Sequence, residues 1–122
     1  MKTIHLVAAI SIASFIGCSE VEQDDTPDSV LKSFGTMFPN AKNVEWEHED
    51  DVWEAEFISN EHEVSAEYSK TGGWIETETT LHRSEVPSPV VDGIFAKYTN
   101  AEFLKFEEVR GEDFLAYEVD IL

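Results

Sequence analysis

Two stretches of the chain, about residues 27–38 and 87–98, repeat one spacing of apolar residues. In both stretches apolar residues recur every three or four positions, which predicts a helix with one apolar face. Thr26 and Ser88 are expected to cap the two helices, and Pro39 is expected to end the first. The apolar positions are Val30, Leu31, Phe34, Met37 and Phe38 in the first stretch and Val90, Val91, Ile94, Phe95 and Tyr98 in the second.

After each helix the pattern changes to an alternation of apolar with acidic or other polar residues, which predicts β-strands. The apolar members are Val44, Trp46 and His48, then Trp53, Ala55 and Phe57, then Val64, Ala66 and Tyr68, and later Leu104, Phe106, Tyr117, Val119 and Ile121. A further strand is expected over about residues 74–81, and short connections favour antiparallel pairing. The sequence therefore predicts an α+β fold: two helix-then-strands repeats, about 27–81 and 87–122, forming an antiparallel sheet with helices packed on one face.

The residues between the apolar positions are mainly glutamates, so the other face of the predicted sheet is acidic. Six glutamates are expected to share it: Glu45, Glu47, Glu54, Glu56, Glu63 and Glu67. Like charges opposite each other across strands destabilise a sheet. Two interpretations stay open: a solvated face that keeps the protein soluble, or a surface that meets cations or a basic partner.

The strand over residues 74–81 adds an aromatic residue to this picture. Its two rows are Ile75, Thr77, Thr79 and Leu81, and Trp74, Glu76 and Glu78. If the first row faces the core, Trp74 lies on the acidic face, where an exposed tryptophan is typical of a contact surface. The alternative is that Trp74 covers a sheet edge or packs under a loop. The candidate partner-binding residues are Trp74, Glu76, Glu78, Glu54 and Glu56.

The start of the chain is typical of a bacterial secretory signal. Lys2 precedes an apolar run over residues 4–16, which is too short to span a bilayer comfortably. Gly17 and Cys18, the single cysteine of the chain, follow the run directly. This ending resembles a lipobox, the site at which bacterial lipoproteins are cleaved and acylated, with Phe15 where leucine is usual. The alternative is an ordinary signal peptide with an incidental cysteine.

The predicted organisation is therefore a lipoprotein signal peptide over residues 1–17, an acidic tether over 18–26 and a folded domain over 27–122. Acylation of Cys18 would give a lasting membrane anchor. We expect the protein to be exported and lipid-anchored in the cell envelope, in the periplasm or at the outer membrane.

Charge excludes several classes of function. The chain has 8 Lys and Arg against 26 Asp and Glu, a net charge of −18, whereas nucleic acids and anionic membranes attract basic proteins. No HExxH motif, phosphate-binding loop or nucleophile elbow is present, and His48, His62 and His82 fall on separate predicted elements. We expect no enzyme, no cofactor and no nucleic-acid partner. The turns at Asp50–Asp51 and Glu112–Asp113 can bind divalent cations only weakly.

Four segments carry a resemblance to a known family. They are FPNAKNVEWE at residues 38–47, EAEF at 54–57, EVSAEY at 63–68 and GWIETET at 73–79. Together they resemble the PepSY-like, or β-lactamase-inhibitor-like, family of small envelope proteins common in Bacteroidota. The resemblance covers roughly residues 27–122 and implies a fold like that of β-lactamase inhibitor proteins. It transfers no function and no inhibitory loop residue, although PepSY-type domains are suspected of inhibiting peptidases or binding envelope partners.

Together these observations predict a non-catalytic envelope lipoprotein that acts as a binding module, inhibitor-like toward an envelope enzyme or peptidase. The alternative is an acidic cation-binding or structural component of the envelope without a specific protein partner.

Overall fold

The computed structural model describes residues 19–21 and 25–122. The predicted signal peptide and Cys18 lie outside the described residues. The strands are β1 (Ser19–Val21), β2 (Lys42–Glu49), β3 (Val52–Ser59), β4 (His62–Ser69), β5 (Trp74–Thr80), β6 (Phe103–Gly111) and β7 (Leu115–Ile121). The helices are α1 (Asp28–Met37), the short 3₁₀ helix η2 (Arg83–Glu85) and α2 (Ser88–Lys97).

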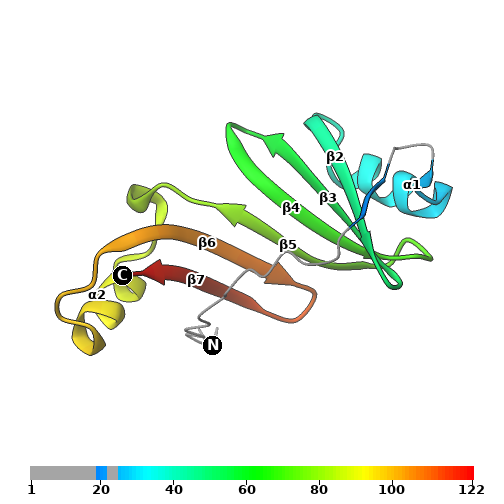
Figure 1. Cartoon of the computed structure of the whole chain (residues 1–122). Coiled ribbons are helices and arrows are strands. Elements are labelled where there is room, and N and C mark those ends of the chain that lie inside the picture. The colour runs from blue at the N-terminus through cyan, green and yellow to red at the C-terminus, as the bar shows by residue number, and fades with distance from the viewer. Residues whose placement is uncertain (1–18, 22–24) are drawn as a thin grey trace.

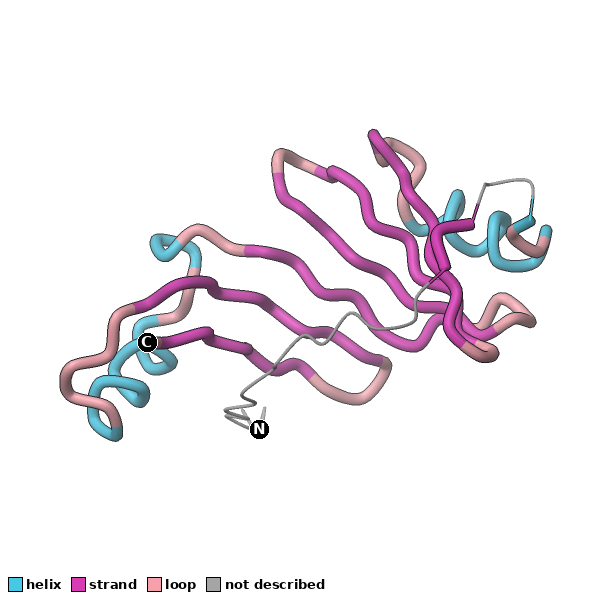
Figure 2. Tube along the Cα trace, viewed as in Figure 1, coloured by secondary structure: helices cyan, strands magenta, loops and turns pink. Residues whose placement is uncertain are grey.

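The described strands form one seven-stranded antiparallel sheet in which each strand pairs with its neighbours along the chain. Figure 1 shows this meander, with α1 and α2 well apart along the sheet. Short turns join most consecutive strands, whereas the longer link from β5 to β6 carries η2 and α2 (Figure 2). The predicted α+β fold is therefore confirmed. β1 pairs with residues 46–48 of β2. β1 itself lies within residues 18–26, the segment for which the sequence predicts a tether.

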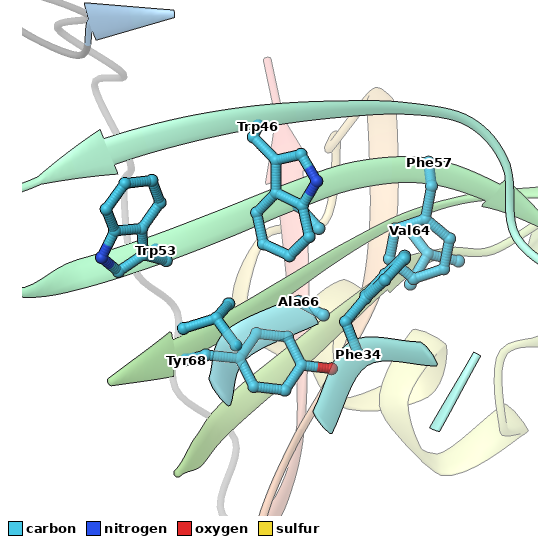
Figure 3. Packing of buried hydrophobic residues seen from close by; sticks show 9 residues of the cluster. Phe34, Trp46, Trp53, Phe57, Val64, Ala66 and Tyr68 are labelled. Carbon is cyan, nitrogen blue, oxygen red and sulfur yellow. The ribbon is translucent and has the colours of Figure 1, made fainter. Parts of the chain in front are cut away.

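α1 packs on the first half of the sheet through Phe34. The centroid of its ring lies 5.2 Å from that of Trp46, 5.0 Å from that of Phe57 and 6.4 Å from that of Tyr68, edge to face each time. Aromatic rings favour this geometry because the positive edge of one ring meets the negative face of the other. Figure 3 shows the side chains of β2, β3 and β4 that gather around Phe34. Val30, one turn before Phe34, is fully buried, so the predicted apolar stripe of α1 faces the sheet.

α2 covers the second half of the sheet in the same manner. Val90 packs in a cluster with Phe106 and Tyr117. The register places Ala66 opposite Thr77 and Thr77 opposite Arg110. Because directly opposed residues point to the same side of a sheet, the residues beneath α1 and those beneath α2 face the same way. Both helices therefore cover one face, as predicted.

The two units end their helices with the same hydrogen bond. Phe38 donates its backbone N–H to the carbonyl oxygen of Phe34 at 2.8 Å, and Tyr98 donates to Ile94 at 2.7 Å. These pairs are 60 positions apart in the sequence, the offset at which the apolar patterns align. The helix ends therefore agree with the predicted duplication.

Each unit also has a β-bulge soon after its helix. One register shift lies between Lys42 and Glu45 in β2, and the other lies between Phe103 and Lys105 in β6. In β6 the extra residue leaves Leu104 60% exposed, while Phe103 packs against the α2 cluster. The prediction that Leu104 faces the core is wrong, because a bulge breaks the strict alternation on which it rests.

Both helices begin directly after a proline. The carbonyl oxygens of Pro27 and Pro87 accept the first helical hydrogen bonds, from Val30 and Val90, at 2.9 Å. Neither helix has a side-chain cap, and Thr26 Oγ1 is buried without a hydrogen-bond partner among the described residues. The predicted caps are wrong because each proline occupies the capping position, which leaves Thr26 one residue before it and Ser88 one residue after it, as the first residue of α2.

The turn between β4 and β5 is fastened to α1. Ser29 Oγ donates to the carbonyl oxygen of Lys70 at 3.0 Å, and Ser33 Oγ donates to that of Gly72 at 2.7 Å. Gly72 has φ of 87°, and a Cβ there would lie 2.5 Å from the carbonyl oxygen of Ser29. Both the left-handed backbone and the close approach of the helix require glycine at this position.

Candidate functional site

The face of the sheet opposite the helices, which we call the acidic face, is built mainly from carboxylates. Its acidic residues are Glu45, Glu47 and Glu49 on β2, Glu54 and Glu56 on β3, Glu63 and Glu67 on β4, Glu76 and Glu78 on β5, Glu107 on β6, and Glu118 and Asp120 on β7. The six glutamates predicted to share a face do so. Four of the five candidate partner-binding residues, Glu54, Glu56, Glu76 and Glu78, lie on it.

Four of these glutamates form a ladder across neighbouring strands. Glu47 lies opposite Glu54, Glu54 opposite Glu67, and Glu67 opposite Glu76. Other like-charged pairs on this face are Glu45 with Glu56 and Glu107 with Glu118. Like charges at directly opposed positions repel. The ladder is therefore a place where an added cation or basic side chain would stabilise the fold.

Protonation offers another way to relieve this repulsion. Burial, followed by the charges of Glu107, Glu118, Glu76 and Glu67, raises the pKa of Glu78 to about 7. Burial also leads the causes that raise the pKa of three other glutamates of this face, Glu56, Glu67 and Glu118, and neighbouring carboxylates add to it. Both causes disfavour the ionised form. The charge of the acidic face therefore changes near neutral pH.

A shallow hollow of about 640 Å³ lies over the acidic face. Lys105 is the only basic side chain among the described residues that line it, and its Nζ lies 2.6 Å from Glu107 Oε1. Burial acts to lower the pKa of Lys105, but the hydrogen bond to Glu107 and the charges of nearby carboxylates raise it overall. Lys105 is therefore held in its charged form. It shows within the protein how a basic side chain binds to this surface.

One polar contact orders part of the hollow. Ser65 Oγ donates a hydrogen bond to Glu54 Oε1 at 2.5 Å, between neighbouring strands. Nearby, Glu47 Oε2 is buried without a hydrogen-bond partner among residues 25–122. A buried acceptor without a donor costs free energy. The acidic face is therefore destabilised by a buried acceptor that lacks a donor as well as by charge repulsion.

Trp74 does not lie on the acidic face. A register shift between β4 and β5 pairs Tyr68 with Trp74, although Glu67 pairs with Glu76. The indole packs against the α1 cluster, and its Nε1 donates to Thr77 Oγ1 at 2.9 Å. Ile75, expected in the core row, is 39% exposed. The predicted placement of Trp74 is wrong because it assumes a strand without a bulge.

The β3–β4 turn and the η2 segment, which are far apart in the sequence, meet where the ring of His62 contacts the carboxylate of Glu85. His62 Nε2 lies 2.9 Å from both carboxylate oxygens of Glu85, and His62 Nδ1 lies 2.9 Å from the carbonyl oxygen of Asn60. Glu85 Oε2 also accepts the backbone N–H of His82 at 2.8 Å. Both ring nitrogens of His62 face acceptors, so the doubly protonated ring fits best. The hydrogen bond to Glu85, followed by that to Asn60, raises the pKa of His62.

This contact ties the β3–β4 turn to η2, the link between the two repeats. Sequence reasoning missed it because His62 and Glu85 are separated by 23 positions, and only the pairing of β4 with β5 returns the chain to this place. In the sequence, His62 closely follows Asn60, a residue type common in turns. The structure adds that Asn60 and Glu61 both have positive φ.

The carboxylates and histidines do not gather into a metal centre in the described part of the chain. Within residues 25–122, no three His, Cys, Asp or Glu side chains are arranged so that they could hold a metal ion. Over the same residues, no helix is both long and apolar enough to cross a bilayer.

Solved structures from Bacteroides share this fold. A protein of Bacteroides eggerthii, described as one of the "putative periplasmic proteins", superposes with a TM-score of 0.74 at 19% identity, over 80% of this chain and 72% of that chain. A BLIP-like protein of Bacteroides fragilis gives a TM-score of 0.71 at 19% identity, over 79% of this chain and 72% of that chain. At these identities the likeness establishes the fold alone. A comparison with curated proteins gives no match.

The sequence profile of one protein family matches the chain over residues 51–122, which is more than half of its length. The family is described as "Putative beta-lactamase-inhibitor-like, PepSY-like". The matched range includes β3 to β7 and α2, and therefore most of the acidic face. On this match, and in agreement with the fold, the chain belongs to the PepSY-like family.

Proposed function

We propose that this protein is a non-catalytic binding module of the bacterial cell envelope, which uses its acidic face to bind a basic surface of a partner protein and acts as an inhibitor of an envelope enzyme or peptidase. The observation that carries the proposal is the ladder of Glu47, Glu54, Glu67 and Glu76 across four neighbouring strands. A sheet gains nothing in stability from like charges in register. Such a ladder is understandable if these charges serve recognition.

The energetics of the acidic face favour a protein partner that carries lysines and arginines. Desolvation and mutual repulsion make the ionised form of Glu78 costly in the free protein. A basic side chain placed among these carboxylates would remove the repulsion and supply charge-assisted hydrogen bonds. The ion pair of Lys105 with Glu107 is an internal example of that contact. The net charge of −18 would also speed encounter with a basic partner at low salt.

Trp74 is not part of this proposed surface. The indole lies against α1, on the other face of the sheet from Glu76 and Glu78. The proposed contact residues are therefore Glu54, Glu56, Glu76 and Glu78 together with the neighbouring acidic residues of the hollow.

The test is capture of a partner from envelope extracts of the native organism with the full chain as bait. The test variant replaces Glu54, Glu56, Glu76 and Glu78 with glutamine. Its matched control neutralises four exposed residues away from this surface: Glu61, Asp92, Glu112 and Asp113. We expect one stoichiometric partner with the native chain and the control, and its loss with the test variant, because only the test variant removes the charges that are to be recognised.

Two outcomes contradict the proposal. Retention of the same partner by the test variant would place binding elsewhere on the molecule. Promiscuous retention that follows only ionic strength would instead favour the alternative, an acidic cation-binding or structural component of the envelope.

Attachment to the membrane through acylated Cys18 belongs to this proposal. It is supported by the position of the single cysteine directly after an apolar run in the sequence. Replacement of Cys18 with serine should release the protein from membranes or leave its precursor unprocessed, because serine offers no thiol for acylation. Cell fractionation tests this, and unchanged membrane retention with normal maturation would contradict the anchor.

A further inference from the structure

The outer edge of β7 has no strand beside it among the described residues. β7 is the last strand of the sheet and pairs with β6. Its sequence, LAYEVDI, contains no proline, glycine or lysine, and the bulge of this hairpin lies in β6. Natural sheets commonly protect an edge with such residues or with a bulge, because unpaired backbone groups attract another strand. β7 lacks these devices over its whole length, and its charged side chains are the two carboxylates Glu118 and Asp120.

The backbone groups that point to this edge can be identified from the two ends of the strand. The carbonyl oxygen of Phe114 accepts a hydrogen bond from Gly111, and the N–H of Leu122 donates to Glu102, so both residues face β6. Backbone groups along a strand alternate between its two sides. The residues whose N–H and C=O groups point outward are therefore Leu115, Tyr117, Val119 and Ile121.

Large exposed apolar side chains flank both ends of this edge. Phe114, which precedes β7, is 46% exposed, and Leu122, which follows it, is 81% exposed. Leu104, 60% exposed, lies in β6 near the Leu122 end. Of these three side chains, only Leu104 and Leu122 lie at the same end of the strand, because the ring of Phe114, at the other end, occupies the space that a Cβ of Gly111 in β6 would need. Exposed apolar groups close together are typical of interaction sites, so the Leu122 end of this edge adds a second observation to the unpaired backbone.

The two faces of β7 define what an added strand would meet. Leu115, Tyr117 and Val119 lie on the helix side, in contact with the α2 cluster. Glu118 and Asp120 lie on the acidic face, beside Glu107 and Lys105. An added strand would therefore continue an apolar row on one side and a carboxylate row on the other.

Charge decides between a second copy of this chain and another partner. In an antiparallel pair of two β7 strands centred on Val119, Glu118 of one copy would lie opposite Asp120 of the other, and like charges opposed across strands destabilise pairing. A chain with a net charge of −18 also repels its own copies at long range. A strand with lysine or arginine at alternate positions avoids both the repulsion between opposed carboxylates and the long-range repulsion between two acidic chains.

We propose that the outer edge of β7 is a strand-addition site for an extended segment of another protein in which basic and apolar residues alternate. The basic side chains would contact Glu118 and Asp120, and the apolar side chains would continue the row formed by Leu115, Tyr117 and Val119. The backbone hydrogen bonds supply affinity, and the alternation supplies specificity. This site goes beyond the proposed function, because its backbone contacts are made by the unpaired edge of β7, and it uses only Glu118 and Asp120, the two carboxylates of the acidic face that lie on this edge strand.

The experiment titrates the full chain with a capped heptapeptide of alternating lysine and valine, and with a control peptide of alternating glutamate and valine. Amide hydrogen exchange measured by NMR reports the site. We expect the lysine peptide to slow exchange at Leu115, Tyr117, Val119 and Ile121 by about tenfold or more, since each outward N–H gains a hydrogen bond. The glutamate peptide should leave these amides unprotected.

Two variants separate the edge from the acidic face. Val119→Pro removes one outward N–H and should weaken lysine-peptide binding by about tenfold. The double variant Glu118→Lys, Asp120→Lys keeps every backbone group and should reverse the preference toward the glutamate peptide, so the proposal stays testable if Val119→Pro does not fold. A control variant, in which Glu54 and Glu56 of β3 are replaced by glutamine, should still bind the lysine peptide at the edge of β7.

Three results would overturn the inference. The first is an absence of binding by the lysine peptide. The second is binding that leaves the β7 amides unprotected and is lost in the Glu54 and Glu56 control, which would assign the peptide to the acidic face and leave the proposed function standing. The third is protection of the same four amides that grows with protein concentration in the absence of peptide, which would make a second copy the occupant.

Discussion

Trp74 lies opposite Tyr68 across β4 and β5, one position out of step with the neighbouring pair Glu67 and Glu76. That shift turns the indole toward α1 and leaves Ile75 39% exposed. One extra residue in a strand therefore decides that this tryptophan stabilises the core and that the acidic face carries no tryptophan from β5.

Replacement of Trp74 with alanine should lower the free energy of unfolding by about 1–3 kcal/mol, less than for a fully buried tryptophan because part of the side chain is already exposed. Ile75→Ala is the matched control and should cost less than about 1 kcal/mol, as is usual for exposed positions. Urea unfolding measures both. If Ile75→Ala costs more than Trp74→Ala, the pairing of Trp74 with Tyr68 is wrong.

Trp46 and Phe106 occupy corresponding buried places in the two units, at 4% and 7% exposure. Alanine at either position should cost about 3–5 kcal/mol, because a large cavity replaces a buried ring. Leu104→Ala, at a position that is 60% exposed, should change stability by no more than about 0.5 kcal/mol. Chemical denaturation of the three variants tests this, and a loss near 1 kcal/mol at Trp46 or Phe106 would contradict the burial of these rings.

Two glycines should respond in opposite directions to alanine. At Gly72 the positive φ and the carbonyl oxygen of Ser29 leave no room for a Cβ, so Gly72→Ala should destabilise by about 1 kcal/mol or more. Gly35 lies in α1, where an added Cβ would meet no neighbouring group within 4 Å. Gly35→Ala should stabilise by about 0.5–1 kcal/mol, because alanine favours a helix. Thermal unfolding gives both signs, and equal effects would contradict the turn geometry.

Stability should rise as pH falls from 8 toward 5. The pKa of Glu78 is about 7 in the folded protein against 4.5 for an ordinary glutamate. The folded protein therefore binds this proton at a higher pH than the unfolded chain does, and folding gains free energy between those two values. The melting temperature should increase by several degrees across that range, and added salt at pH 8 should raise it too by screening repulsion.

Glu78→Gln isolates the cause of this pH dependence. The variant should melt higher than the native protein at pH 8 and should show a flatter pH profile, whereas Glu112→Gln in the exposed β6–β7 turn should leave the profile unchanged. The opposite result, a melting temperature of the native protein that declines steadily from pH 8 to pH 5, would contradict this prediction. It would show that favourable partners stabilise the ionised carboxylates of the acidic face, and that repulsion between them is not the dominant effect.

The ring of His62 should titrate above the usual histidine value of 6.5, because Glu85 and Asn60 both accept hydrogen bonds from the protonated ring. A raised folded pKa means that this contact stabilises the fold below pH 6.5 and that its contribution is lost as pH rises through the folded pKa. NMR titration of the ring protons measures the value directly. Glu85→Gln should lower the pKa of His62, and an unchanged value in that variant would exclude the contact in solution.

Local pattern alone determined much of this protein. The 3.6-residue spacing located both helices, and the alternation after them located the strands and assigned Glu54, Glu56, Glu76 and Glu78 to one face of the sheet. These features follow from nearest neighbours in the chain, since a helix or strand presents its faces with a fixed period. The duplication could also be recognised from the sequence, because each unit repeats that local pattern.

Tertiary structure decided the rest. The places of Trp74, Leu104 and Phe103 depend on bulges, where backbone pairing with another strand overrides alternation within a strand. The contact of His62 with Glu85 and the burial that raises the pKa of Glu78 depend on which strands become neighbours. Strand order, register and desolvation arise from contacts between residues distant in the chain, and a local pattern carries no information about them.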